Sequence, residues 1–302
     1  MKILHALAVL VSLSPALRAE PSASPAFFSA LNGLRASVGS VTAFSQQEQE
    51  TLLQLFNDSD PAVRRAALKA FRAYVGQRQS NWERVLEIAR RTSEDASVRR
   101  EAIKTLSVVS GYNDVSDALL RIAQRDAEPK LRQVAYKALY WQAFSRSSVA
   151  DELIREAVRG GDGDVRRAAI WGLFLAVGNT DPRESLLRLA ERDSDAAVRV
   201  EALKSLYGAM GHSDVRDYVM RLARNGGEPS VRLTAILALS ARNNNDGRDI
   251  LENIARRDSD PLARAAAITA LGDPLSDELV RHFHLLRRDQ SGRVIRDPLD
   301  LE

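Results

Sequence analysis

The sequence contains no cysteine, which excludes several kinds of protein at once. No disulfide can support the fold, no thiolate can act as a nucleophile or bind zinc, and no lipid can be attached at a lipoprotein cysteine. Tryptophan and methionine are also scarce, with three copies each among 302 residues. Stability must therefore come from the packing of ordinary aliphatic side chains.

Histidine is too sparse to predict a metal centre. His5 lies near the amino terminus, His212 stands alone, and His282 and His284 would point to different faces of a helix. The sequence also lacks a Gly-x-Ser-x-Gly motif and a glycine-rich phosphate loop. We therefore predict a chain without catalytic residues, metal ligands or cofactors.

Neither sign of charge dominates the composition. The 43 basic and 40 acidic residues give a formal net charge of +3. Without Lys2 and Arg18, which belong to the leader described next, 41 basic residues face the same 40 acidic ones. A balanced chain has no global field for nucleic acid or an anionic membrane, so the composition argues against nucleic acid as the partner.

Residues 1–19 have the layout of a secretory signal peptide. Lys2 precedes an apolar run from Ile3 to Leu13, and small residues lead up to a cleavage position after Ala19. The run is too short to span a bilayer. We predict a protein without a membrane span that is exported to the periplasm or secreted.

A pattern of 32 to 35 residues occurs seven times in the rest of the chain. Each copy has an arginine, an acid four residues before it and an alanine three residues after it. The arginines are Arg64, Arg99, Arg132, Arg166, Arg199, Arg232 and Arg264. The acids are Asp60, Asp95, Glu128, Asp162, Asp195, Glu228 and Asp260. A near-constant period in this range indicates a stacked repeat array.

Each copy predicts a pair of helices. The acid suits the start of a helix, because its side chain accepts hydrogen bonds from the first backbone N–H groups. Apolar residues four and seven places after the arginine continue a buried stripe. A second apolar helix precedes this one, as in the segments 85–89, 119–123, 186–190 and 219–223. Such a hairpin must stack on its neighbours to bury both faces.

These features resemble the HEAT repeat, in particular the short HEAT-like repeat of the phycobilin lyases. The resemblance implies an all-α fold, a right-handed α-solenoid of about seven to eight hairpins, in which the repeated acids and arginines form a structural ladder between neighbouring units. Deoxyhypusine hydroxylases have a similar architecture but bind iron through His-Glu pairs, and no His-Glu dipeptide occurs in this sequence.

The repeats divide the chain into four parts. Residues 1–19 are the predicted signal peptide, and 20–47 form an amino-terminal cap segment that covers the first apolar face. The array extends over 48–288 and ends with a last outer helix over 276–288. Residues 289–302 form a carboxyl-terminal tail without a clear pattern.

One face of the second helices carries the candidate binding residues. At about 100° per residue, the positions five and nine places after each arginine point away from the buried stripe. Four of the seven residues at position five are lysines, although the chain has only six. The candidates for the concave face are Lys69, Lys104, Lys137, Tyr140, Trp141, Trp171, Leu175 and Lys204. The alternative is that the aromatic residues fill gaps between helices and the lysines solvate the face.

The sequence thus favours a non-catalytic, exported scaffold that binds a partner protein or peptide on its concave face. One alternative is a ligand-handling enzyme of the phycobilin lyase type built on the same repeats. A third reading is the binding of nucleic acid or an acidic polymer along the lysines, which would weaken steeply with salt.

Overall fold

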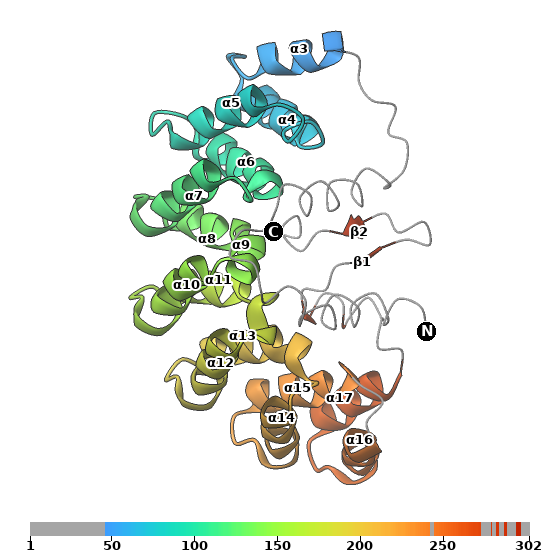
Figure 1. The fold of residues 1–302 in the computed structure, drawn as a ribbon. Helices are drawn as coiled ribbons and strands as arrows, with labels where there is room; N and C mark the ends of the chain where they lie inside the picture. The colour runs from blue at the N-terminus through green and yellow to red at the C-terminus, as the bar shows by residue number, and fades with distance from the viewer. Residues whose placement is uncertain are drawn as a thin grey trace, which may run out of the picture.

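The computed structural model describes residues 46–241 and 245–272, together with 279, 282–283, 287–288 and 294–296. The predicted signal peptide, residues 20–45 of the cap segment and most of the tail lie outside the described residues. In the described part, seven helical hairpins stack into an arc, which confirms the predicted all-α solenoid (Figure 1).

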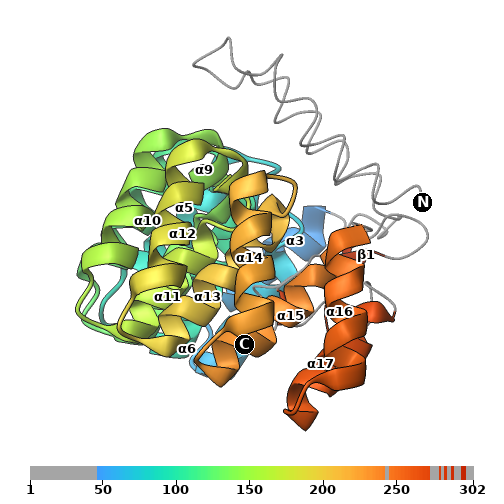
Figure 2. The same cartoon turned by 90° about the horizontal axis from the view of Figure 1, so that it is seen from below.

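Two layers of helices build the arc. The outer layer contains α3 (Gln46–Leu55), α5 (Gln79–Arg90), α7 (Asn113–Arg125), α10 (Ser147–Arg159), α12 (Thr180–Arg192), α14 (Ser213–Asn225) and α16 (Asn245–Arg257). The inner layer contains α4 (Pro61–Phe71), α6 (Ala96–Leu106), α8 (Pro129–Ala138), α11 (Gly163–Gly172), α13 (Ala196–Leu206), α15 (Pro229–Ala238) and α17 (Pro261–Leu271). Figure 2 shows the last hairpin, α16 and α17, side by side at one end of the arc.

The repeated acids start the inner helices. The Asp60 side chain accepts a hydrogen bond from the Ala62 N–H at 2.8 Å, and equivalent bonds start every other inner helix except α8. Hydrogen bonds from Ser230 and Val231 lower the pKa of Glu228, so this acid is negatively charged at the positive end of its helix. The caps therefore fix where each inner helix begins.

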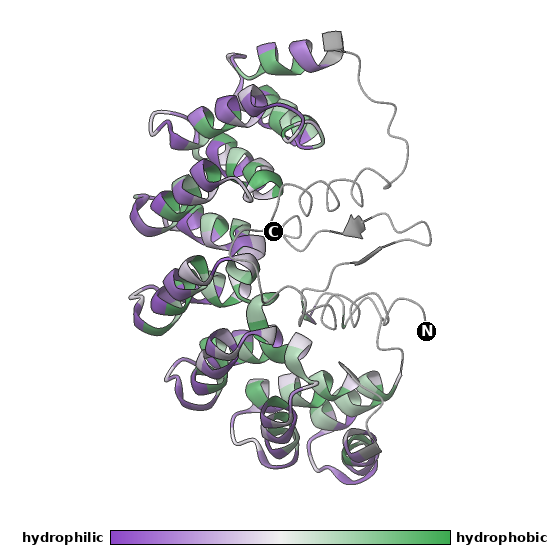
Figure 3. Ribbon diagram, in the orientation of Figure 1, coloured by the Kyte–Doolittle hydropathy of each residue, from purple (hydrophilic) through white to green (hydrophobic). Residues whose placement is uncertain are grey.

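One continuous apolar core runs between the two layers from Phe56 to Phe283. The alanines three residues after the repeat arginines are all at most 3% exposed. Figure 3 shows hydrophobic residues where the layers face each other and hydrophilic residues on the outer side. Neighbouring inner helices contact each other along their length, whereas neighbouring outer helices touch much less. The inner layer consequently forms the concave face of the arc.

The inner helices α8 and α11 approach each other very closely. A Cβ atom at Gly172 would lie 2.8 Å from the Tyr136 backbone oxygen and 2.6 Å from the Leu153 side chain. Only glycine fits this position, because real Cβ atoms do not come within 3.0 Å of such neighbours. The close approach brings the side chains that follow Gly172 next to those that follow Ala138.

The repeat arginines link neighbouring hairpins, but mostly through other acids than expected. Among the described residues, only Arg132 pairs with an acid that starts the next inner helix, with its Nη2 3.8 Å from Asp162 Oδ2. The closer pairs are Arg64–Glu94, Arg99–Asp126, Arg166–Asp193 and Arg232–Asp258. The expected ladder of helix-starting acids is therefore wrong at these four places. Most of those acids already bind the backbone N–H groups of their own helix. The arginines therefore form ion pairs with acids one or two residues earlier in the loop.

Three of the loop aspartates bind two arginines each. The Asp193 carboxylate accepts hydrogen bonds from Arg166 of the preceding hairpin, and its backbone oxygen accepts one from Arg199 Nη1 at 2.7 Å. Asp126 binds Arg99 and Arg132 in the same way, and Asp258 binds Arg232 and Arg264. We call each such arrangement an aspartate clamp. The clamps join the hairpins of α6 and α8, of α11 and α13, and of α15 and α17.

The carboxyl-terminal part departs from the predicted last helix. Residues 279 and 282 are helical, as expected, but Arg287 and Arg288 form the strand β1 (Arg287–Arg288) instead of ending a helix. This strand pairs antiparallel with β2 (Val294–Arg296), with Arg287 opposite Arg296 and an irregular register at the next pair. Backbone pairing with the following segment thus replaces the last helical residues. Both strands lie on the concave side of the arc (Figure 1).

The contribution of the aspartate clamp at Asp258 to stability can be tested by unfolding at acidic pH. The hydrogen bond from Arg232 holds the pKa of the Asp258 carboxyl below its usual value. The clamp is therefore fully stabilising above the ordinary pKa of about 4 and is lost as the pH falls through the lower folded-state pKa. We expect Asp258→Asn to cost about 2 kcal/mol in urea unfolding at pH 7 and progressively less below about pH 4.

Asp217→Asn is the matched control, because the Asp217 side chain is 67% exposed and lies 3.9 Å from Arg216. It should change the free energy of unfolding by less than about 0.5 kcal/mol. A loss for Asp258→Asn that stays constant from pH 7 to pH 3 would show that the charge of the clamp contributes nothing.

Candidate interaction surface

The concave face of the inner helices changes in character along the arc. Basic side chains lie on α4 and α6 at the amino-terminal end, and aromatic side chains gather around α11 in the middle. Towards the carboxyl-terminal end, α15 and α17 are mostly hydrophobic (Figure 3). The candidate residues from the sequence fall into the first two of these zones, with Lys204 on α13 beyond them.

The four candidate lysines do not form a uniform exposed row. Lys69 is exposed, and Lys137 and Lys204 are half-buried. Lys204 Nζ lies 3.8 Å from Glu201 Oε2 one turn earlier. Lys104 is only 4% exposed, so its expected exposure is wrong in this structure. Packing of the aliphatic part of the side chain against neighbouring helices accounts for such burial of a lysine.

Five side chains form an aromatic cluster that is separate from the main core. Tyr140 and Trp171 are buried, at 5% and 2% exposed, and Trp141, Phe174 and Leu175 pack half-buried around them. The Tyr140 ring lies 5.7 Å from Trp171 and 5.5 Å from Phe174, measured between ring centroids. The expected exposure of Tyr140 and Trp171 is therefore wrong. These two rings fill the gap between helices, and the other three side chains carry the accessible surface.

A local change in the repeat creates this cluster. In four other repeats the inner helix is followed by a short 3-10 turn: η2 (Ser107–Val109), η3 (Ala176–Gly178), η4 (Tyr207–Ala209) and η5 (Leu239–Ala241). After α8 the chain instead forms a further α-helix, α9 (Tyr140–Ser145). Helix α9 places Tyr140 against Trp171 and Phe174, and Trp141 packs beside Tyr140. Phe174 was missed as a candidate, although its place eight residues after the repeat arginine equals that of Tyr140.

Lys137 lies over the aromatic cluster. Its Nζ is 5.7 Å from the Trp171 ring centroid, within the range of a cation–π contact. The cluster therefore presents a positive charge beside half-exposed aromatic and aliphatic side chains. This combination suits recognition of a group that is apolar at one end and polar or negative at the other.

A basic groove lies between α4 and α6. Its lining consists of Ala62, Arg65, Ala66, Lys69, Arg100, Glu101 and Lys104. Sequence reasoning found the two lysines but missed Arg65 and Arg100. Both follow a repeat arginine directly, and that position was not assigned to the concave face. Glu101 Oε1 lies 3.0 Å from Arg72 Nη2, so the one carboxylate in the groove is already paired.

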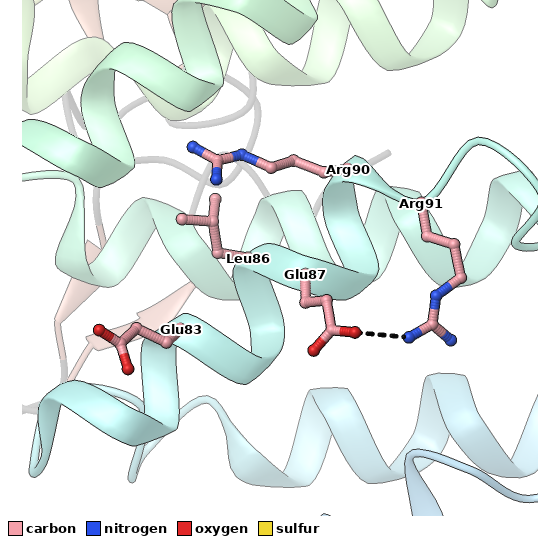
Figure 4. A pocket seen from close by; sticks show the side chains of 5 residues that line it. All are labelled: Glu83, Leu86, Glu87, Arg90 and Arg91. Atoms are coloured by element: carbon pink, nitrogen blue, oxygen red, sulfur yellow. Dashed lines mark hydrogen bonds and ion pairs between the residues drawn. The ribbon is translucent and has the colours of Figure 1, made fainter.

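A second hollow lies on the outer layer and has a different character. Glu83, Leu86, Glu87, Arg90 and Arg91 line it, all from α5 and the residue that follows it (Figure 4). Arg91 donates to Glu87 across one helical turn at 3.1 Å. Mixed charges paired along one helix are the ordinary solvated flank of an outer helix.

The described residues contain no group of three or more His, Asp or Glu side chains placed to hold a metal ion. Shifted pKa values occur at buried tyrosines: burial raises the pKa of Tyr218 to about 12, and burial together with Glu156 raises that of Tyr136. The Tyr136 hydroxyl donates to Glu156 at 3.2 Å, which connects α8 with α10. These tyrosines stay protonated and act in packing.

The family of the repeats follows from comparison with known proteins. The sequence pattern of HEAT repeats matches residues 49–140, 150–226 and 184–272, which is more than half of the chain. The protein belongs to the HEAT-repeat family. No curated protein matches this HEAT-repeat chain in sequence. None of its described helices is long and apolar enough to cross a membrane.

Solved structures with a similar fold have low sequence identity to this chain. The complex of CpcE and CpcF of phycocyanin lyase from Nostoc is 16% identical, with a TM-score of 0.45 over 82% of this chain and 98% of that one. YibA of E. coli is 17% identical, with a TM-score of 0.48 over 86% and 90%. Human deoxyhypusine hydroxylase is 19% identical, with a TM-score of 0.33 over 88% and 96%. Likenesses of this size carry no conclusion about activity or partners.

The different burial of Trp171 and Trp141 can be tested by replacing each side chain with alanine. Trp171→Ala removes a buried ring from the centre of the aromatic cluster, and we expect a loss of about 3 to 5 kcal/mol in stability. Trp141→Ala removes a half-buried ring at the edge and should cost about 1 kcal/mol, following the smaller apolar area that it covers. Thermal and urea unfolding measure both. Equal losses would contradict the division into a buried base and an accessible edge.

Proposed function

We propose that this HEAT-repeat protein is a non-catalytic scaffold that holds a segment of a partner protein on the concave face of its arc. Curved repeat arrays offer long surfaces for such segments. The observation that carries the proposal is the aromatic cluster, where Trp141, Phe174 and Leu175 remain half-exposed over a buried base of Tyr140 and Trp171.

The buried base supports binding because it fixes the accessible rings before a partner arrives. Trp171 lies 5.1 Å from Phe174, and Tyr140 lies 5.4 Å from Trp141, between ring centroids. Rings held in this way lose little conformational freedom on binding, which leaves more of the contact energy for affinity. Tryptophan in a well-packed surrounding is also the residue type most enriched in binding hot spots.

The proposed scaffold works outside the cytoplasm. This part rests on residues 1–19 alone, with Lys2, the apolar run and the small residues before Glu20. The partner would then be a protein of the periplasm or the cell exterior. Both parts of the proposal can be tested separately.

The surface is tested by affinity capture from an extract of the producing cells. We expect a partner that the wild type retains to be lost with Lys137→Glu/Trp141→Ala, since this variant removes the charge and the accessible ring at the cluster. The matched control is Arg121→Glu/Tyr112→Ala, which makes the same kinds of change at exposed residues of the outer layer. Retention by both variants, with helicity unchanged and thermal midpoints well above the assay temperature, would place binding elsewhere and reject the aromatic cluster as the binding surface.

Export is tested by fractionation of the producing cells and mass spectrometry of the purified chain. We expect a mature protein that begins at Glu20 in the periplasmic or extracellular fraction. A chain that keeps residues 1–19 and stays in the cytoplasm would contradict export, without affecting the binding surface.

A further inference from the structure

The basic groove between α4 and α6 carries more positive charge than its surroundings balance. Arg65 and Lys69 of α4 and Arg100 of α6 line it beside the small residues Ala62 and Ala66, whereas Lys104 of α6 is only 4% exposed. The only carboxylate of the groove, Glu101, is paired with Arg72. The groove therefore has an excess of cations on a surface where small residues let a ligand come close.

The arginines of the outer layer are paired only in part. Some exposed arginines of the outer layer lie near acids one helical turn away, as in the pairs Arg91–Glu87, Arg188–Glu184 and Arg248–Glu252. Within the described part of the chain, Arg65, Lys69 and Arg100 have no carboxylate within salt-bridge distance. The groove thus gathers three cations without a paired carboxylate on two neighbouring inner helices.

The positive charge is concentrated at one end of the concave face. Further along, α8 contributes Lys137 over the aromatic cluster, Arg167 on α11 pairs with Asp164, and Lys204 on α13 lies near Glu201. Beyond these, α15 offers Leu237 at the equivalent position. A nucleic acid carries a charge at every nucleotide and needs a long run of cations. A ligand whose negative charges are clustered, and which is apolar further along, fits this face better.

We propose that the basic groove binds a run of Asp or Glu residues in an extended segment of the partner protein. An apolar residue of the same segment then packs against Trp141, Phe174 and Leu175. Guanidinium groups suit this role because their planar N–H donors match a carboxylate in two-point hydrogen bonds. The inference rests on the proposed function, since it names the chemistry of the segment that the concave face would hold.

The distance between the two contacts sets the spacing in the segment. Packed helices lie about 10 Å apart, and the aromatic cluster is two inner helices further along the array than the groove. An extended chain covers about 3.3 Å per residue, so the acidic run and the apolar residue should be separated by about six residues.

The probe is a fluorescein-labelled synthetic peptide with a glutamate run, a spacer of about six Gly and Ser residues, and Leu-Phe. Binding is measured by fluorescence anisotropy with the full chain. We expect Arg65→Glu/Arg100→Glu to weaken binding at least about tenfold, because like charges then face each other in the groove. The matched control, Arg84→Glu/Arg90→Glu, makes the same change on exposed residues of the outer helix α5 and should bind as the wild type does. Circular dichroism and thermal midpoints verify that both variants fold.

Several results would overturn the inference. Equal weakening by both double variants would show a response to net charge alone. Equal binding of a peptide with glutamine in place of glutamate would remove the role of the carboxylates. Tighter binding of a labelled single-stranded oligonucleotide of the same charge would assign the groove to nucleic acid. A spacer shortened to two residues that binds equally well would separate the groove from the aromatic cluster.

The inference and the proposed function fail in different ways. If the peptide does not bind, but a captured partner is still lost with Lys137→Glu/Trp141→Ala, only the acidic chemistry is rejected. If the peptide binds in the groove, but capture depends on neither concave-face variant, the groove is a ligand site and the scaffold proposal falls.

Discussion

The structure depends on one constraint, which is that a single hairpin of two amphipathic helices cannot bury both of its apolar faces. Stacking resolves this, and each inner helix carries a buried alanine, which is small enough for neighbouring elements to pack closely. The inner helices pack along their length, whereas the outer helices spread apart. The concave face follows directly from this difference, because the more closely packed layer becomes the inner side of the arc.

The aspartate clamps recur at every second hairpin, so they add a longer period to the basic repeat. Asp126, Asp193 and Asp258 are 67 and 65 residues apart, which is twice the basic period. Each carboxylate reaches back to the preceding arginine, and each backbone oxygen accepts from the following one. In the alternate loops, Ser93, Gly160 and Gly226 stand at the equivalent place, so no such clamp forms there. The array is thus built from three clamped pairs that follow the first hairpin.

The same architecture explains why the candidate binding features are concentrated where they are. Repeats share the residues that face the core, but they are free to differ at the positions that face away from it. The additional helix α9 changes one repeat enough to gather Tyr140, Trp141, Trp171 and Phe174 at the centre of the arc. The cations of α4 and α6 lie nearby on the same face. A surface with separate basic and aromatic zones suits a partner segment with matching zones.

The sequence by itself determined the period, the helix starts, the buried stripe and hence the solenoid, because these depend on spacings within one repeat. It also placed the aromatic residues and lysines on one face, since a helix converts residue number into direction. Only the tertiary structure decided which acids meet the arginines and how far Lys104, Tyr140 and Trp171 are buried. It also showed that β1 and β2 replace the end of the predicted last helix. Those features depend on contacts between neighbouring units, where a shift of one or two residues in a loop selects a different partner.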